Sequence, residues 1–346
     1  MNRRTIVLNN SGNQPAAAVL ADGQLEDFLF STGCSEFEPG AILNAVIGRP
    51  LQRQGLTVVR LSGRSNAMLK SRIAYRQGAH IPVQISAYAE PGKILPVTDR
   101  FELRGRYSLL SSARTGISIS RKIRAPEFRA QLTEIGKDIP AAREYGVIFR
   151  SSASIAGNSE LRDEINHLSE CAGRVNAAKD STKPGLIVPA PSPLDRAVAA
   201  WGGEAFDIDD GSDAFDRQGI HDLLDPFRQS EWVLPNGGNL AIETFRAMTA
   251  IDVNTGSDLS PSAALKTNIQ AARALSRQLR IRGLGGQIVV DFAPMRKTDR
   301  PLPEKELAKA FAEDRISTTL VGWTGLGHFE LNRHRDRLPL THWEGH

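Results

Sequence analysis

The chain has 346 residues, of which 40% are hydrophobic and 24% charged, and its formal net charge is +4 at pH 7. This length allows two or three domains with real cores, and the composition excludes a disordered chain. No apolar run approaches the ~20 residues that a membrane-spanning helix needs, and the N-terminal MNRRTIVLNN has no apolar signal segment. We therefore expect a cytoplasmic protein without a membrane partner.

The two cysteines, Cys34 and Cys171, lie far apart and outside any Cys-x-x-Cys spacing. Such usage suits a reducing compartment and provides no structural zinc site. The arginines are more informative, because guanidinium forks match phosphate geometry. Arginines crowd three segments and acids crowd a fourth: Arg100–Arg124, Arg273–Arg282, Arg333–Arg337 and Asp207–Asp216. This distribution favours a partner that carries phosphate groups.

The first third of the chain is rich in β-strand signals. Residues 5–30 predict two short apolar strands joined by turns, with Asp22-Gly23 as a hairpin signal. Residues 41–119 alternate short β-rich runs with polar turns, as in LTVVRLSG, HIPVQISAY and RYSLLSS. About five short strands of this kind predict a small barrel.

The middle of the chain mixes helices with extended segments. Residues 117–200 predict a helix around Phe128–Ile135, the run GVIFRSSAS, a helix over Glu160–Ala178 and an extended proline-rich stretch over Pro184–Pro193. The acidic FDIDDGSDAFD that follows lacks the pattern and the terminal glutamate of an EF-hand. We interpret it as a solvated loop.

The main functional signal lies in Leu240–Met295. Two apolar runs each end on one aspartate, Asp252 and Asp291, and an arginine-rich helix lies between them. Apolar runs of this length predict buried strands, and Asn254 with Gly256 lets the chain turn out of the sheet. Further on, PLPEKELAKAFAEDR predicts a helix, and ISTTLVGWTGLGHFELNRHR predicts a strand and a final helix.

The two aspartates need a physical explanation. Aspartate is depleted inside strands, and an unpaired buried carboxylate is costly enough that it neutralises or finds a cation. A Mg²⁺ ion removes that cost, and it is usually held by one or two carboxylates plus waters and substrate phosphate. The alternative is that Asp252 and Asp291 only begin turns or cap helices. Their spacing alone leaves both interpretations open.

The sequence around the two aspartates resembles the catalytic region of the ribonuclease E/G family of bacterial endoribonucleases. The four blocks that carry the resemblance are AIDVNTG, TNIQAA, ARALSRQLRIRGLGG and IVVDF, in this order. The family has (A/T)IDVNSG, TNLEAA-EIARQLRLR and IDFIDM in the same order. Further matches are QGAHIPVQISA and VTDRFELRGRYSLL, then ISRKI and GVIFRSS, and later WVLPNGGNLAIE.

The resemblance implies an α+β fold of several subdomains. Its catalytic core would be RNase H-like and DNase I-like, with an inserted S1/OB-type β-barrel and a 5′-sensor region, and the N-terminal strands would join the catalytic sheet. The implied parts are 1–38 (N-terminal strands of the RNase H-like subdomain), 39–119 (degenerate S1/OB-like barrel), 120–200 (5′-sensor-like region), 201–282 (RNase H-like subdomain) and 283–346 (DNase I-like subdomain).

The resemblance also implies a Mg²⁺-dependent endoribonuclease that hydrolyses single-stranded RNA and leaves 5′-phosphate and 3′-hydroxyl ends. Asp252 and Asp291 match the residues that hold one Mg²⁺ per active site. Asn254 would hydrogen-bond an aspartate or a metal-bound water. These three residues are the candidate catalytic residues.

A second implied site binds the 5′-monophosphate of the RNA. The family's arginine and threonine at that site correspond to Arg150 and Ser151, and Arg121 and Gly105 belong to the same candidate set. An arginine with a hydroxyl is sound phosphate chemistry, and the alternative is a strand-end arginine paired with a nearby acid.

Contacts to the rest of the RNA would be made mainly by basic residues. In the barrel, Val59 and Met68 stand where the family has aromatic residues, so RNA capture would depend on charge. The candidates for RNA binding are Lys93, Arg106, Arg277, Arg280 and Arg282, with Lys70, Arg72 and Arg104 as further basic residues of the barrel. The alternative is a solvated basic face, with at least half of the helix arginines solvated or paired within the helix.

Three departures from the family pattern weaken the catalytic interpretation. Pro294 replaces the second acid of IDFIDM, Arg246 stands where a glutamate is usual, and Gly325 stands where the family has an arginine. The runner-up hypothesis is therefore a catalytically weak or inactive RNA-binding or regulatory relative. A third hypothesis is a nuclease that acts on DNA or only on structured RNA.

The family's C-P-x-C zinc link and small dimerisation domain have no counterpart in the sequence. We therefore expect no zinc and no zinc-linked tetramer, but a monomer or a dimer.

Overall fold

The computed structural model describes residues 4–10, 13–33, 36–51, 55–90, 92–139, 141, 144–203, 205–258 and 260–345. Cys34 lies outside these residues. The chain divides into two compact units, which are residues 1–30 with 208–346 and residues 31–207. Within the described residues, none of the helices has both the length and the apolar character needed to cross a bilayer.

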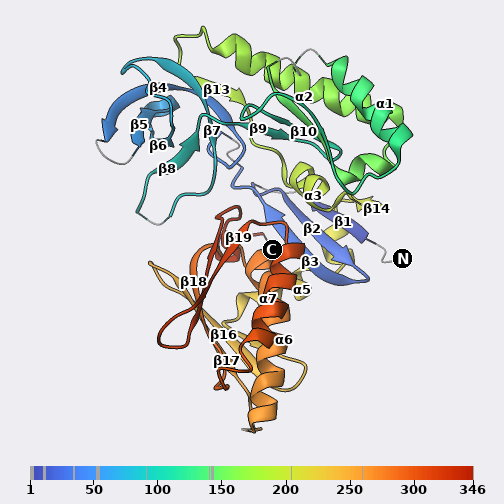
Figure 1. The fold of residues 1–346 in the computed structure, drawn as a ribbon, viewed down its shortest axis with the longest axis vertical. Helices are drawn as coiled ribbons and strands as arrows, with labels where there is room; N and C mark the ends of the chain where they lie inside the picture. The colour runs from blue at the N-terminus through green and yellow to red at the C-terminus, as the bar shows by residue number, and fades with distance from the viewer. Residues whose placement is uncertain are drawn as a thin grey trace. The chain divides into compact units, whose positions relative to one another are not determined.

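A closed five-stranded β-barrel occupies the first part of the unit 31–207 (Figure 1). Its strands run in the order β4-β5-β6-β8-β7, and pairing of β4 with β7 closes the ring. The bounds are β4 (Ile42–Leu51), β5 (Leu56–Arg60), β6 (Asn66–Lys70), β7 (His80–Ile85) and β8 (Leu95–Thr98), with a short 3₁₀ turn η1 (Ser62–Arg64) between β5 and β6. Alternate side chains fill the interior, including Leu43, Val59, Leu69 and Val83. The predicted barrel is confirmed and fits an S1/OB-type insertion.

The barrel ends earlier than we predicted, because RYSLLSS belongs to a second sheet. That sheet has the order β11-β12-β10-β9, in which β11 and β12 are parallel. Its strands are β9 (Glu102–Arg104), β10 (Ser108–Ser111), β11 (Gly116–Ile119) and β12 (Gly146–Phe149). Helices α1 (Pro126–Lys137) and α2 (Asn158–Ala178), both predicted, pack against it and share its core. The remaining elements of this unit are η3 (Ser151–Ile155), β13 (Gly185–Val188), which pairs with β4, and α3 (Pro193–Trp201).

The N-terminal segment forms three strands rather than the predicted two. They are β1 (Arg4–Asn9), β2 (Ala16–Ala21) and β3 (Gln24–Phe30), and Asp22-Gly23 forms the β2–β3 turn with φ values of 49° and 77°. Strand β2 is alanine-rich, so its β-propensity is weak, but five of its six residues are buried. The acidic segment also contains a strand, β14 (Phe206–Asp209), that pairs beside β1, where we predicted only a loop. Helices α4 (Ala214–Arg217) and α5 (Ile220–Arg228) pack on these strands.

A six-stranded sheet of order β15-β16-β17-β18-β20-β19 forms the rest of the unit that contains the C-terminus. Its strands are β15 (Glu231–Val233), β16 (Asn239–Thr244), β17 (Thr249–Asn254), β18 (Gly286–Asp291), β19 (Thr318–Trp323) and β20 (Phe329–Arg333). The N-terminal strands do not join it, which corrects the arrangement implied by the family resemblance. They form a separate sheet that packs on the helix between β17 and β18.

The order strand, helix, strand predicted for Leu240–Met295 is confirmed. Helix α6 (Pro261–Ile281) begins after Ser260, whose hydroxyl accepts the N–H of Ala263, and Pro261 occupies the first turn without losing a hydrogen bond. Helix α7 (Pro301–Glu313) lies beside it (Figure 1). Both helices bury their apolar faces on one side of the sheet.

The predicted final helix is wrong. The segment instead forms the β19–β20 hairpin, in which apolar and polar residues alternate along FELNR as buried and less buried positions. Glycine at position 327 turns the chain with a φ of 100°. Only a short 3₁₀ turn, η4 (Leu340–His342), follows.

Candidate functional site

The two aspartates lie side by side on adjacent parallel strands. Asp252 of β17 and Asp291 of β18 are register partners, and both side chains are exposed on the face of the sheet opposite α6 and α7. The neighbours of Asp252 in β17, Ile251 and Val253, point into the core instead. Since side chains alternate across a strand, the buried residues fix the direction in which the aspartates point. We call the site formed by Asp252 and Asp291 on these two central strands the acid edge.

Asn254 orients one member of the pair. Its Nδ2 donates to Oδ2 of Asp252 at 2.9 Å and also lies 3.3 Å from Oδ1 of Asn239, across the β16–β17 ladder. Residues 252 and 254 are two apart on one strand, so they share a face. The amide therefore holds one carboxylate oxygen in place.

Sequence reasoning missed His328. Its Nε2 lies 3.8 Å from Oδ1 of Asp291, and its side chain is 37% exposed. It stands at the end of the β19–β20 hairpin, next to Phe329, which pairs with Val290. The sequence signal was a histidine within TGLGHFE, but only the strand pairing shows which acid it faces.

A second missed residue, Asn268, fixes the chain just after Asp291. From α6, its Nδ2 donates to the carbonyl of Ala293 at 2.9 Å, and its Oδ1 accepts the N–H of Ala293 at 3.0 Å. The side chain of Asn268 is fully buried. One amide thus satisfies both backbone groups of a residue that leaves the sheet beside the acid edge.

Replacing Asn268 by alanine is expected to lower the free energy of unfolding by roughly 2–4 kcal/mol, because it leaves a buried N–H and a buried C=O unpaired. The rate of any reaction at the acid edge should fall as well, since the segment after Asp291 loses its anchor. Urea unfolding measures the first effect. Lys266→Ala, an exposed change on the same helix, is the control for stability, and equal midpoints for the two variants would contradict the anchoring role.

The residues that we predicted to bind the RNA 5′-phosphate lie at one end of the second sheet of the unit 31–207. Arg121 follows β11, Arg150 and Ser151 follow β12, and Gly105 lies in the β9–β10 turn. Because β11 and β12 are parallel and β10 is antiparallel to β12, all four positions lie at the same end of the sheet. Arg121 and Ser151 are exposed.

The guanidinium of Arg150 binds backbone carbonyls at this end of the sheet. Its Nη1 donates to the carbonyls of Ala199 at 2.6 Å, Gly105 at 2.8 Å and Arg106 at 3.3 Å. The backbone N–H of Arg150 donates to the carbonyl of Tyr107 at 2.8 Å. These hydrogen bonds fix Arg150 in place, so that its side chain does not extend into solvent. The neighbouring Tyr107 stays neutral, because burial raises the pKa of its hydroxyl.

The chain was then compared with known proteins. The model of the ribonuclease E/G family matches residues 102–207 and 204–336, which is more than half of the chain. The chain belongs to the ribonuclease E/G family.

Individual relatives agree with the family match. Ribonuclease G of Escherichia coli (strain K12) is 27% identical over 303 residues, which cover 77% of this chain and 62% of the relative. Ribonuclease G of Salmonella typhimurium (strain SL1344) is 35% identical over 133 residues, covering 37% of this chain and 27% of the relative. Ribonuclease E of Escherichia coli (strain K12) is 27% identical over 300 residues, which cover 75% of this chain and 28% of the relative. The chain thus spans less than two thirds of each of these relatives.

The acid edge of this ribonuclease E/G family member fits a Mg²⁺ ion by its donor chemistry. Two exposed carboxylates stand side by side, and within the described residues neither pairs with an arginine or a lysine. In the same part of the chain, no group of three or more histidine, cysteine, aspartate or glutamate side chains is arranged to hold a metal. Mg²⁺ is the ion that commonly accepts one or two carboxylates and keeps its waters.

The three departures from the ribonuclease E/G pattern differ in their distance from the acid edge. Arg246 lies in the β16–β17 turn, next to the Thr244–Thr249 pair, at the end of β17 opposite Asp252. Pro294 is exposed directly after Ala293. Gly325 lies in the β19–β20 hairpin, at the end of the sheet where Asp291 stands. Arg246 is therefore remote from the acid edge, whereas Gly325 lies at the same end of the sheet as Asp291.

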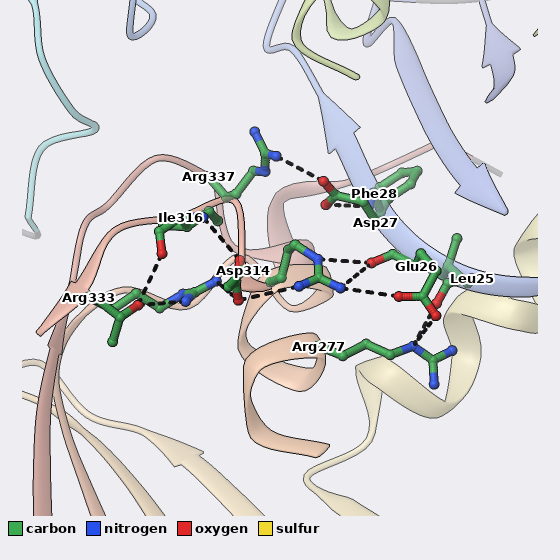
Figure 2. A network of polar contacts seen from close by, with 11 residues as sticks. Leu25, Glu26, Asp27, Phe28, Arg277, Asp314, Ile316, Arg333 and Arg337 are labelled. Carbon is green, nitrogen blue, oxygen red and sulfur yellow. Dashed lines mark hydrogen bonds and ion pairs between the residues drawn. The ribbon is translucent and has the colours of Figure 1, made fainter. Parts of the chain in front are cut away.

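The helix arginines that we predicted as RNA contacts bind groups inside the fold, as Figure 2 shows for Arg277. Arg277 donates through Nε to the carbonyl of Leu25 at 2.8 Å, and Arg280 donates through Nε and Nη2 to the carbonyl of Glu26 at 2.9 and 2.8 Å. The register of β2 and β3 shifts at Glu26, which forms a β-bulge. At this bulge the guanidinium of Arg280 binds the carbonyl of Glu26 and ties α6 to β3.

Arg282 is also internal. Its side chain binds Gln278 and the carbonyl of Gln229, and the residue is 7% exposed. Burial lowers the pKa of Arg282 to about 10 and also lowers the pKa of Arg277. For Arg280 and Arg282 the prediction of RNA binding is wrong, because their guanidinium groups are buried. Arg277 is held in the same way, although its side chain keeps 27% exposure.

The two predicted RNA contacts in the unit 31–207 differ. Lys93 is 68% exposed and its Nζ lies 2.6 Å from Glu90. The guanidinium of Arg106 lies 4.8 Å from the ring centre of Tyr107 and 4.5 Å from that of Phe206, and its Nε donates to Gly202. Lys93 is therefore open to a ligand, whereas Arg106 is held between two rings within its own unit.

Proposed function

We propose that the protein is a Mg²⁺-dependent endoribonuclease that hydrolyses phosphodiester bonds in single-stranded RNA. The observation that carries the proposal is the register pairing of Asp252 with Asp291 on parallel strands, in a chain of the ribonuclease E/G family. Relatives named ribonuclease G and ribonuclease E support RNA as the substrate and endonucleolytic hydrolysis as the reaction. A cytoplasmic location follows from that substrate.

In this proposal Asp252 and Asp291 hold one Mg²⁺ ion. When bound, the ion would polarise the scissile phosphate and lower the pKa of an attacking water, and we propose products with 5′-phosphate and 3′-hydroxyl ends. Asn254 keeps Asp252 in orientation through its hydrogen bond of 2.9 Å. Asn268 holds the backbone after Asp291 in place.

The same proposal assigns the subdomains. The N-terminal strands β1–β3 with residues 201–282 correspond to the RNase H-like part, and residues 42–98 correspond to the S1/OB-like barrel. The second sheet of the unit 31–207 with α1 and α2 corresponds to the 5′-sensor region, and residues 283–346 correspond to the DNase I-like part. Arg150 and Ser151, with Arg121 and Gly105, would bind the 5′-monophosphate. Lys93 would contact the RNA chain. The protein would act as a monomer or a dimer.

The second candidate function is a catalytically weak, RNA-binding relative. Gly325 favours it, because the family has an arginine at this position near Asp291. Losing one donor that stabilises charge in a transition state typically lowers a rate by ~10²–10³-fold. Slow cleavage is therefore compatible with an intact acid edge.

A metal-dependence assay separates the two functions. The purified protein is incubated with a 5′-monophosphorylated, AU-rich RNA oligonucleotide, either with Mg²⁺ or with EDTA. We expect cleavage only with the metal, and products that carry 5′-phosphate and 3′-hydroxyl ends. Binding without product at every metal concentration would exclude the enzyme and leave the RNA-binding function.

A further inference from the structure

We infer that Glu164 of α2 is a positioning residue that holds Arg150 in its phosphate-binding arrangement through two peptide groups of the β9–β10 turn. The inference rests on the proposed binding of the RNA 5′-monophosphate by Arg150. It concerns a residue to which neither the sequence motifs nor the family resemblance gave a role.

The carboxylate of Glu164 binds three consecutive backbone N–H groups. Oε2 accepts the N–H of Arg106 at 2.6 Å, and Oε1 accepts the N–H groups of Tyr107 at 3.0 Å and Ser108 at 2.8 Å. The hydroxyl of Ser108 donates to Oε1 at 2.7 Å as well. Successive N–H groups that converge in this way form a concave anion site, which here holds a carboxylate of the same chain.

Arg150 holds the opposite ends of the same peptide groups. The N–H of Arg106 and the carbonyl of Gly105 belong to one peptide group, and the N–H of Tyr107 and the carbonyl of Arg106 belong to the next. Arg150 donates to both carbonyls, at 2.8 and 3.3 Å, and the hydroxyl of Ser152 donates to the second. A peptide group is planar, so fixing its N–H end also fixes its C=O end.

Glu164 therefore fixes the positions of two of the carbonyls that accept hydrogen bonds from Arg150. Its negative charge also polarises the two peptide groups and strengthens their carbonyls as acceptors for the guanidinium. If the N–H groups lose the carboxylate, the peptide groups rotate and Arg150 loses the support that keeps its guanidinium at the sheet edge beside Ser151.

The glycine at 105 is explained by the same contact. A Cβ atom built on Gly105 would lie 2.3 Å from Cδ of Glu164 and 2.5 Å from its Oε1. No real Cβ makes such contacts, so any other residue would displace the carboxylate. Gly105 thus serves the 5′-phosphate site by leaving room for Glu164, which gives this position a role different from direct contact with phosphate.

The test compares Glu164→Gln with wild type on matched RNA oligonucleotides that carry a 5′-monophosphate or a 5′-hydroxyl. The amide keeps the shape but turns one acceptor into a donor that faces backbone N–H groups. We expect the ratio of kcat/KM for the two substrates to fall by about tenfold or more, since small misplacements of a binding group are costly. Amide hydrogen exchange in residues 105–109 should become faster in the same variant.

Glu170→Gln is the matched control, because Glu170 is an exposed glutamate on the same helix. Ser108→Ala, which removes only the hydroxyl bond to Glu164, should show a smaller effect of the same kind and replaces Glu164→Gln if that variant does not fold. An unchanged ratio in both variants, or an equal fall in Glu170→Gln, would overturn the inference. Equal rates of the wild-type protein on the two substrates would overturn it together with 5′-end sensing, while metal-dependent cleavage would stand.

Discussion

Replacing Asp291 by asparagine is expected to lower the rate of RNA cleavage by more than about 100-fold. The side chain keeps its size, and its exposed position means that the fold does not depend on its charge. The metal site, however, loses one of its two carboxylates, and Asp252 remains as the only charged ligand from the pair. Replacing a residue that contacts only a metal ligand commonly lowers metal affinity or activity by ~10–100-fold. Replacing a direct ligand should therefore lower the rate by more.

The rate is measured over a series of Mg²⁺ concentrations, and Mg²⁺ affinity is measured by calorimetry on the RNA-free protein. Asp252→Asn should behave in the same way. Glu243→Gln is the control, because Glu243 is an exposed acid on the neighbouring strand β16 and does not belong to the pair. If Asp291→Asn cut RNA as fast as Glu243→Gln, the acid edge would not be the place of the chemistry.

The part of the site that could be predicted from sequence is the part that depends on local pattern. Apolar runs that end on Asp252 and Asp291 predict strands, and a helix between two strands is typical of a parallel pair. The structure has this parallel pair, and it places the two aspartates in register. Asn254 shares a face with Asp252 because both are on one strand, and this too depends only on a period of two.

The part that could not be predicted depends on contacts between distant segments. Arg280 binds the carbonyl of Glu26 at the β-bulge in β3, and nothing in the sequence of α6 indicates this contact. An arginine-rich helix was therefore interpreted as an RNA contact, whereas two of its arginines are buried. His328 and Asn268 were missed for the same reason, because each acts on a residue of another strand or loop.

Two features of the fold have local causes. The segment TTLVGWTGLGHFELNRHR has strong β-formers on both sides of a glycine turn, and this favours the observed hairpin over the final helix that we predicted. The alanine-rich AAAVLA has weak β-propensity but pairs with β1 and β3 on both of its sides. In that case burial between neighbours outweighs intrinsic preference.

Replacing Asp314 by asparagine is expected to destabilise the unit formed by residues 1–30 and 208–346 by roughly 3–5 kcal/mol, because it removes one partner from a buried ion-pair network. The side chain of Asp314 is 0% exposed and lies between Arg333 at 3.0 Å and Arg280 at 3.3 Å (Figure 2). It also accepts the N–H of Ile316 at 3.0 Å. Burial lowers the pKa of Arg333, and the charge and hydrogen bond of Asp314 act against that shift.

The network connects segments that are far apart in the sequence. Arg280 reaches from Asp314 to Glu26 of β3, and nearby Arg337 binds the buried Asp27 at 3.0 Å. Asparagine keeps a polar group at position 314 but removes the acid that Arg333 binds and one of the two acids that Arg280 binds. The N-terminal sheet and the C-terminal strands should therefore lose a shared anchor.

Tryptophan fluorescence during urea unfolding measures the loss, since Trp232, Trp323 and Trp343 all belong to this unit. Glu306→Gln is the matched control, because it breaks the more exposed Arg273–Glu306 pair between α6 and α7 and should change the midpoint far less. If both variants unfolded at the same urea concentration, the buried network would contribute no more than a surface ion pair. The packing of α6 on the N-terminal strands would then rest on its apolar contacts alone.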